Sequence, residues 1–177
     1  MTTAYLVVPC YNEEAVLPET VKRLTEKLRG LIASGRAGED SRILLVDDGS
    51  KDRTWELIAG FHQENRLVSG LKLAHNRGHQ NALLAGLMTA RERADCAISL
   101  DADLQDDIDV LDAFLDKYHE GCEVVYGVRN KRDTDTLFKR STAQGFYKFM
   151  KMLGVDIVYN HADYRLMSRR ALEGLAQ

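Results

Sequence analysis

The sequence predicts an α/β fold with a mostly parallel central sheet and helices on both faces. Continuous apolar runs alternate along the chain with amphipathic stretches of helical period. The runs are apolar throughout and do not alternate with polar residues, which is typical of parallel strands buried on both faces. Three of them end in polar clusters, and ligands of such sheets bind at the carboxyl ends of the strands.

The predicted elements follow one another in a regular βα order. We expect strands at 4–9, 42–47, 70–74, 95–100 and 122–128. We expect helices between them at 13–34, 53–64, 79–93 and 107–120. The first helix carries an apolar stripe made of Leu17, Val21, Leu24, Leu28 and Leu31.

The last part of the chain departs from this order. A charged loop at 129–136 precedes a predicted aromatic helix at 137–153, for which packing on the sheet and contact with a membrane surface both remain open. In the segment 163–167 Asp163 and Arg165 alternate with apolar residues, so on a strand both would face one side. An ion pair between them is the alternative to a catalytic role. Ser168 is expected to cap a final helix.

Composition limits the classes of function. The 177 residues suit a single domain, 1–177, and the net charge of −3 without a basic block argues against nucleic acid as a partner. Three widely spaced cysteines form neither a zinc pattern nor a disulfide framework, so we expect a reducing cytoplasm. No stretch reaches the roughly 18 apolar residues of a membrane span.

The strongest chemical signal is a pair of carboxylates directly after the predicted strand 95–100. Asp101 and Asp103 offer hard oxygen ligands, and Gln105 adds a neutral oxygen. The alternative is that acids here only cap the next helix, which suits Asp106 and Asp107 better. Because neighbouring carboxylates repel each other when unpaired, Asp101 and Asp103 favour a bound Mg²⁺ or Mn²⁺.

Polar residues follow two other predicted strands. Asp48 comes after the strand 42–47 in a turn, where its carboxylate is suited to accept a uracil imide N–H or a ribose hydroxyl. Tyr11 and Asn12 follow Pro9, which we expect to end the first strand because proline lacks an N–H. These two residues form either a helix-capping loop or a wall against a base and ribose, with Glu13 anchoring the loop. Arg77 and Gly78 precede a helix whose amino end favours a diphosphate, although a glycine before a helix is also common in proteins without such a site.

Four motifs in this order carry a resemblance to a known family. They are Val7-Val8-Pro9-Cys10-Tyr11-Asn12-Glu13-Glu14, Val46-Asp47-Asp48-Gly49-Ser50, Asp101-Ala102-Asp103-Leu104-Gln105-Asp106 and Asp163-Tyr164-Arg165-Leu166-Met167-Ser168-Arg169. With them the chain resembles family 2 glycosyltransferases over essentially all of its length. It is most similar to the polyprenyl-phosphate branch, which includes bactoprenol glucosyltransferases and dolichyl-phosphate mannose synthases.

The resemblance implies a GT-A nucleotide-sugar-binding fold and an inverting transfer of a hexose, favouring UDP-hexose as donor, to a polyprenyl phosphate of the cell envelope. It implies that Pro9, Tyr11, Glu13 and Asp48 bind the nucleotide and that Asp101 lies against ribose and metal. Asp103 would be the principal ligand of Mg²⁺ or Mn²⁺, supported by Gln105. Arg129 and Arg140 match positions that hold the acceptor phosphate, and Asp163 and Arg165 match the pair beside the reacting sugar and diphosphate.

The resemblance also implies a cytoplasmic location at the inner face of the membrane for a longer protein, in which membrane-associating helices follow this soluble piece. A soluble variant of the family is the alternative. His161 and Ala162 replace an alanine and a glycine frequent in the family, and His79 stands where a lysine is frequent. A saccharide hydroxyl as acceptor, with Asp163 as base, remains open, as does a binding module that has lost catalysis. The sequence leaves the sugar undecided, and a homo-oligomer is left open.

Overall fold

The structure is a computed structural model that describes residues 1–128 and 161–176. The first part of the chain alternates strands and helices as predicted. Its elements are β1 (Ala4–Cys10), α1 (Leu17–Ala33), β2 (Arg42–Asp47), α2 (Thr54–Glu64), β3 (Val68–Lys72), α3 (His79–Arg91) and β4 (Cys96–Ser99). They are followed by η1 (Ile108–Val110), α4 (Leu111–His119), β5 (Val124–Val128), β6 (His161–Ser168) and α6 (Arg169–Leu175).

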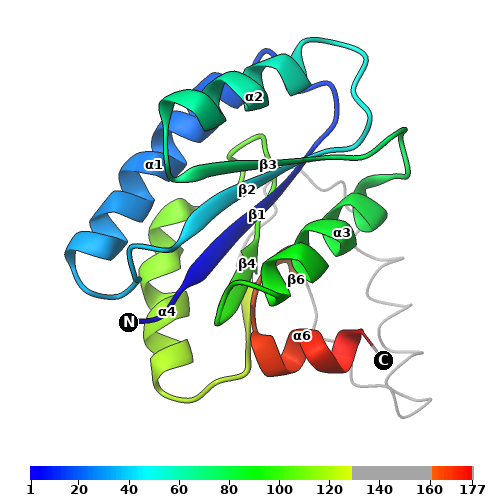
Figure 1. The fold of residues 1–177 in the computed structure, drawn as a ribbon. Coiled ribbons are helices and arrows are strands. Elements are labelled where there is room, and N and C mark those ends of the chain that lie inside the picture. The colour runs from blue at the N-terminus through cyan, green and yellow to red at the C-terminus, as the bar shows by residue number, and fades with distance from the viewer. Residues whose placement is uncertain (129–160, 177) are drawn as a thin grey trace, which may run out of the picture. The chain divides into compact units, whose positions relative to one another are not determined.

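The strands form one six-stranded sheet with the order β3-β2-β1-β4-β6-β5 (Figure 1). β1 pairs in parallel with both β2 and β4, and β2 pairs in parallel with β3. β6 runs antiparallel to β4, with Ser99 opposite Arg165. The predicted mostly parallel sheet is confirmed. Because β6 is antiparallel to β4, the amino end of β6 lies beside the carboxyl end of β4, which Asp101 and Asp103 follow.

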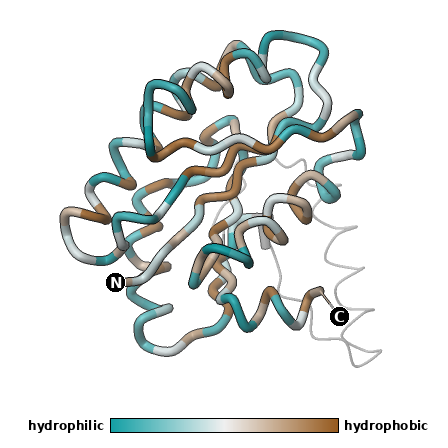
Figure 2. The backbone as a smooth tube through the Cα atoms, viewed as in Figure 1, coloured by the Kyte–Doolittle hydropathy of each residue, from teal (hydrophilic) through white to brown (hydrophobic). Residues whose placement is uncertain are grey.

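Helices cover both faces of the sheet, as predicted (Figure 1). Val7 and Val46 face α3, where they pack against Leu83 and Leu87. Leu6, next to Val7 in β1, is fully buried and so faces the opposite side, which α1 and α2 cover. Figure 2 shows hydrophobic colouring along the central strands. Burial on both faces explains why these strands are apolar throughout.

Several boundaries differ from the prediction. α1 begins at Leu17 and not at 13, because the carbonyl of Glu13 accepts the N–H groups of Val16 and Leu17 in a separate turn. The third strand lies at Val68–Lys72 and not at 70–74. The predicted helix 107–120 consists of η1 and α4. Pro9 does not end its strand, since Cys10 still pairs with Asp47.

The structure describes only part of the carboxyl-terminal region for which the sequence made predictions. The segment 163–167 lies within β6, and Ser168 caps α6, its Oγ accepting the N–H of Ala171 at 3.0 Å. The loop 129–136 and the helix 137–153 lie outside the described residues.

Met1–Val125 and Asp163–Gln177 form one compact unit, and Tyr126–Ala162 fall into a second, of which only the ends in β5 and β6 are described. A single domain over 1–177 therefore stays a prediction. Within the described residues, no helix is both long and apolar enough to cross a bilayer.

Candidate active site

The loops after β1 and β2 are joined by a set of hydrogen bonds between backbone and side chains. Asn12 donates its backbone N–H to Oγ of Ser50 at 3.0 Å, and its Oδ1 accepts the N–H of Lys51 at 2.8 Å. The N–H of Glu13 is bound by Oγ1 of Thr54 at 2.8 Å. Asn12 has a φ of 55°, a backbone conformation that asparagine tolerates well. These bonds fix the loop that carries Tyr11 and Glu13.

The Asp48 carboxylate connects this region to the loop before α3. Its Oδ1 accepts the N–H of Arg77 at 2.7 Å, and its Oδ2 accepts the N–H of Gly78 at 2.9 Å. Asp48 is 2% exposed, so these hydrogen bonds replace water around a nearly buried charge. Three predicted nucleotide-binding residues therefore lie together, and Arg77 and Gly78 bind Asp48 through their backbone N–H groups.

A cavity of about 290 Å³ opens where these loops meet. It is lined by Pro9, Cys10, Tyr11, Glu13, Asp48, Asn76, Gly78, His79 and Ala82. Five of the predicted nucleotide-binding residues are in this lining. Asn12, Arg77 and Asp101 are not in it. Asn12 and Arg77 make the loop contacts described above.

Asp101 and Asp103 lie beside the cavity, after β4. Nε2 of His79 is 3.8 Å from Oδ1 of Asp101. Partial burial raises the pKa of Glu13, and repulsion from Asp103, Asp52 and Asp101 raises it further. This repulsion means that the loop after β1 and the loop after β4 present their carboxylates to a shared region of negative potential, which favours a cation.

The segment after β4 has an unusual backbone. Leu104 has a φ of 56°, a left-handed conformation that costs a residue with a branched side chain about 1–2 kcal/mol. The carboxylate of Asp103 accepts the N–H of Gln105 at 3.1 Å, which closes a tight turn around Leu104. Gln105 contacts Asp103 through this backbone group.

The residues present fit a Mg²⁺ or Mn²⁺ ion that is shared with a substrate. Among the side chains that the structure describes, no group of three or more His, Cys, Asp or Glu is arranged to hold a metal by itself. Two neighbouring carboxylates are what such an ion uses when phosphate oxygens and water complete its coordination. Asp101 and Asp103 suit that arrangement.

β6 supplies the other predicted catalytic residues. Arg165 lies opposite Ser99 and on the same side of β6 as Met167, which packs in the core beneath α3. Nε of Arg165 is buried and makes no hydrogen bond to the described residues. Asp163 lies in β6, but its side chain is outside what the structure describes, so its place relative to Arg165 stays a prediction. Arg129 and Arg140 also lie outside the described residues.

The predicted site residues leave out five contributors to the site. Cys10, Asn76, His79 and Ala82 line the cavity, and Thr54 holds the backbone of Glu13. Thr54 is fully buried at the first turn of α2, and a buried threonine needs a hydrogen-bond partner. A larger cavity of about 390 Å³ lies elsewhere, between α2, α3 and β3, and no carboxylate lines it. It therefore does not offer the chemistry of the site after β4.

Comparison with known proteins identifies a family and several similar chains. The model of the family described as "Glycosyl transferase family 2" matches residues 5–175. The "Uncharacterized glycosyltransferase YkoT" of Bacillus subtilis is 62% identical over 170 residues, covering 96% of this chain and 50% of that protein. The "Prophage bactoprenol glucosyl transferase homolog" of Escherichia coli is 37% identical over 174 residues, covering 96% and 53%. This chain thus spans about half the length of the curated relatives it matches.

A solved structure supports the fold. Glucosyl-3-phosphoglycerate synthase from Mycobacterium tuberculosis, in complex with Mn²⁺, UDP and phosphoglyceric acid, superimposes with a TM-score of 0.62 at 19% identity, covering 96% of this chain and 56% of that one. The fold is of the GT-A type, as the resemblance implied. The family match over residues 5–175 shows that the chain belongs to glycosyltransferase family 2.

Proposed function

We propose that this chain carries an inverting glycosyltransferase site that moves a hexose from UDP-hexose to a polyprenyl phosphate. The observation that carries the proposal is the meeting of four groups at one edge of the sheet: the cavity around Asp48, the carboxylates of Asp101 and Asp103, the amino end of α3, and Arg165. The names of the bactoprenol glucosyl transferase relatives support a lipid phosphate as acceptor.

The nucleotide would occupy the cavity after β1 and β2. The exposed Tyr11 ring offers a stacking surface for the base, and the free lone pairs of Asp48 can accept an imide N–H. Asp101 would lie against the ribose. The diphosphate would extend toward Gly78 at the amino end of α3, where helix N–H groups and the helix dipole stabilise negative charge.

Asp103, with Asp101 and Gln105, would hold Mg²⁺ or Mn²⁺. When bound, such an ion neutralises charge that develops on a departing diphosphate. Arg165 adds a fixed positive charge at the same end of the sheet. Its buried Nε–H, which has no partner among the described residues, would donate a hydrogen bond to an anionic group that reaches it. The metal in the related mycobacterial complex supports a divalent cation here.

In the proposed reaction, an oxygen of the lipid phosphate attacks the anomeric carbon while the bond from that carbon to the diphosphate breaks. The electron pair leaves with UDP, and the configuration of the carbon is inverted. Because the phosphate is already ionised near neutral pH, no general base is required, and Asp163 would orient the donor sugar. Arg129 and Arg140 would hold the acceptor phosphate. The active protein would then work at the cytoplasmic face of a membrane.

The test is transfer of labelled hexose from UDP-hexose to a polyprenyl phosphate, followed by extraction of lipid into organic solvent. We expect labelled lipid that depends on Mn²⁺ or Mg²⁺, and none when the matching polyprenyl alcohol replaces the phosphate. Label in a saccharide acceptor instead would favour a hydroxyl acceptor with Asp163 as base. UDP binding without any loss of UDP-hexose would favour a binding module and contradict the proposal.

A further inference from the structure

Two buried hydroxyl groups bind backbone carbonyls of the segment 101–107, which carries both candidate metal ligands. Oγ1 of Thr20 in α1 lies 2.5 Å from the carbonyl oxygen of Ala102. The phenol oxygen of Tyr164 in β6 lies 2.9 Å from the carbonyl oxygen of Asp107. Thr20 is fully buried and Tyr164 is 5% exposed. The segment is therefore held near both of its ends by side chains that lie outside the proposed substrate site.

The Thr20 hydroxyl has one hydrogen to donate and two carbonyls within reach. The second is that of Val16, at 3.1 Å, which already accepts the backbone N–H of Thr20. The carbonyl of Ala102 is closer, and Ala102 is 4% exposed, so water is a poor substitute there. This carbonyl belongs to the peptide group that joins Ala102 to Asp103. A hydrogen bond to it therefore fixes the peptide plane from which Asp103 projects.

The Tyr164 side chain packs against an aromatic ring of α4. Its ring lies 4.8 Å from that of Phe114 in α4, at an angle of 41°. Burial raises the pKa of the Tyr164 phenol, and the charges of Asp106, Asp107 and Asp109 raise it further. The phenol therefore remains protonated, and remains a donor, throughout the neutral range.

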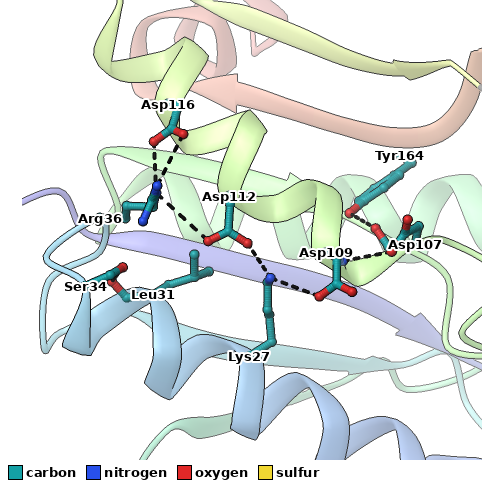
Figure 3. A network of polar contacts seen from close by, with 9 residues as sticks. All are labelled: Lys27, Leu31, Ser34, Arg36, Asp107, Asp109, Asp112, Asp116 and Tyr164. Carbon is teal, nitrogen blue, oxygen red and sulfur yellow. Dashed lines mark hydrogen bonds and ion pairs between the residues drawn. The ribbon is translucent and has the colours of Figure 1, made fainter.

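α1 and the loop after it also contact the residues that follow the segment (Figure 3). Lys27 in α1 lies two helical turns after Thr20 and bridges Asp109 and Asp112. Arg36, in the loop after α1, binds Asp116 at 2.9 Å. Ion pairs near the surface contribute only about 0–1 kcal/mol each and are screened by salt. The buried hydroxyls are better suited to hold the carboxylates in one geometry.

We propose that Thr20 and Tyr164 are positioning residues that preset Asp101 and Asp103 for a divalent cation shared with the nucleotide diphosphate. The inference rests on the proposed function. Neither residue lines the cavity of the proposed nucleotide site. They act because a loop that is ordered before binding loses less conformational entropy when the ion binds, which strengthens binding.

The test compares Thr20→Val, which keeps the branched shape and removes the hydroxyl, with Thr20→Ser, which keeps the hydroxyl. Mn²⁺ affinity is measured from the electron paramagnetic resonance signal of free Mn²⁺ at saturating UDP. UDP affinity without metal is measured by calorimetry. We expect Mn²⁺ binding to weaken on the order of tenfold in Thr20→Val, because a tenfold change in affinity corresponds to the free energy of about one hydrogen bond. Metal-free UDP affinity should stay unchanged, and Thr20→Ser should restore Mn²⁺ binding.

Matched controls separate positioning from general destabilisation. Thr25 is a buried threonine of the same helix whose hydroxyl accepts a hydrogen bond from Asn65 at 2.9 Å, away from the segment. Thr25→Val should keep normal Mn²⁺ affinity. Tyr164→Phe should weaken Mn²⁺ binding in the same way as Thr20→Val. Tyr118→Phe should not, since the Tyr118 hydroxyl contacts Asp95 at the other end of β4.

The possible results distinguish a failure of the positioning role from a failure of the proposed function. Normal Mn²⁺ affinity in Thr20→Val, or equal weakening in Thr20→Ser and Thr20→Val, would overturn the role of the hydroxyl. If Thr20→Val does not fold, Tyr164→Phe decides in its place. A parent protein that binds no Mn²⁺ at saturating UDP would contradict the proposed function itself, and the inference would fall with it.

Discussion

Asp48 at the end of β2 and Gly78 before α3 are joined by a hydrogen bond of 2.9 Å from the glycine N–H to Oδ2 of the carboxylate. A second bond, from the N–H of Arg77 to Oδ1, is 2.7 Å long. The Asp48 carboxylate therefore shapes the entrance to α3, in addition to the nucleotide contact that we propose for it.

Replacing Asp48 with asparagine should affect both roles. An amide has one acceptor oxygen, and its NH₂ group would face a backbone N–H, so one donor loses its partner. We expect a loss of stability of about 2 kcal/mol, or roughly 4–8 °C in melting temperature, together with weaker UDP binding. Asp40→Asn, at an exposed position, is the control for removal of a negative charge. A normal melting temperature in Asp48→Asn would show that the two bonds contribute little.

Gly49 should not tolerate a side chain. It has a φ of 68°, and a Cβ there would lie 2.6 Å from the backbone nitrogen of Asn76. We expect Gly49→Ala to destabilise the protein by at least about 2 kcal/mol, from backbone strain and displacement of the 75–76 backbone. Gly30→Ala is the contrasting variant, because Gly30 lies in α1 with open space around it. It should stabilise the protein by about 0.5–1 kcal/mol. Urea unfolding of both variants should show a lower free energy of unfolding for Gly49→Ala and a higher one for Gly30→Ala.

The three cysteines should differ sharply in reactivity. Burial raises the pKa of Cys96 to about 12 and also raises that of Cys10, whereas Cys122 is exposed. Since the thiolate is the reactive form, a thiol reagent should modify Cys122 rapidly in the native protein and the other two only on unfolding. Rapid modification of all three in the native state would contradict the burial of β1 and β4.

The same thiols predict a pH dependence. Because their pKa values are higher in the folded state, the folded protein retains protons that the unfolded chain loses. Their contribution to stability is complete below the ordinary thiol pKa of 9.0 and is lost as the pH rises from there through the folded value. Urea unfolding should therefore show lower stability at pH 10 than at pH 8. Equal or greater stability at pH 10 would contradict the predicted contribution of the buried thiols.

Asp103→Asn should separate stability from function. In the free protein, the charge of Asp103 repels the Glu13 carboxylate and helps to raise the pKa of Glu13. Because this pKa is higher in the folded than in the unfolded state, the protein loses stability as Glu13 ionises with rising pH. Removing the Asp103 charge should therefore slightly raise the melting temperature at neutral pH. The variant should also lose Mn²⁺-dependent UDP binding. Retained Mn²⁺ dependence would remove Asp103 from the metal site.

The sequence predicted the sheet and the strand ends that surround the site, because continuous apolar runs followed by polar residues are local signals. The insertion of antiparallel β6 between β4 and β5 is not local, since strand partners depend on tertiary packing. The bonds from Asp48 to residues 77 and 78 also cross about 30 positions of the chain and leave no local pattern.

Two other differences had a local signal. Pro18 lies in the first turn of α1, a position that proline favours, and so marks a helix start later than 13. Thr20 interrupts the apolar stripe of the same helix, and a buried hydroxyl requires a partner. The stripe thus pointed to a polar contact beneath α1, although only the structure identifies it as Ala102.

The most direct test of the nucleotide-sugar site is a thermal unfolding titration of the protein with UDP and with GDP, each with and without Mn²⁺. At about 100 times the dissociation constant, a ligand stabilises the folded state by about 2.7 kcal/mol, which corresponds to roughly 5–10 °C here. We predict a shift of that size with UDP in the presence of Mn²⁺, a smaller one with UDP alone, and little with GDP. Absence of any shift with UDP and Mn²⁺ at millimolar concentration would contradict the proposed site.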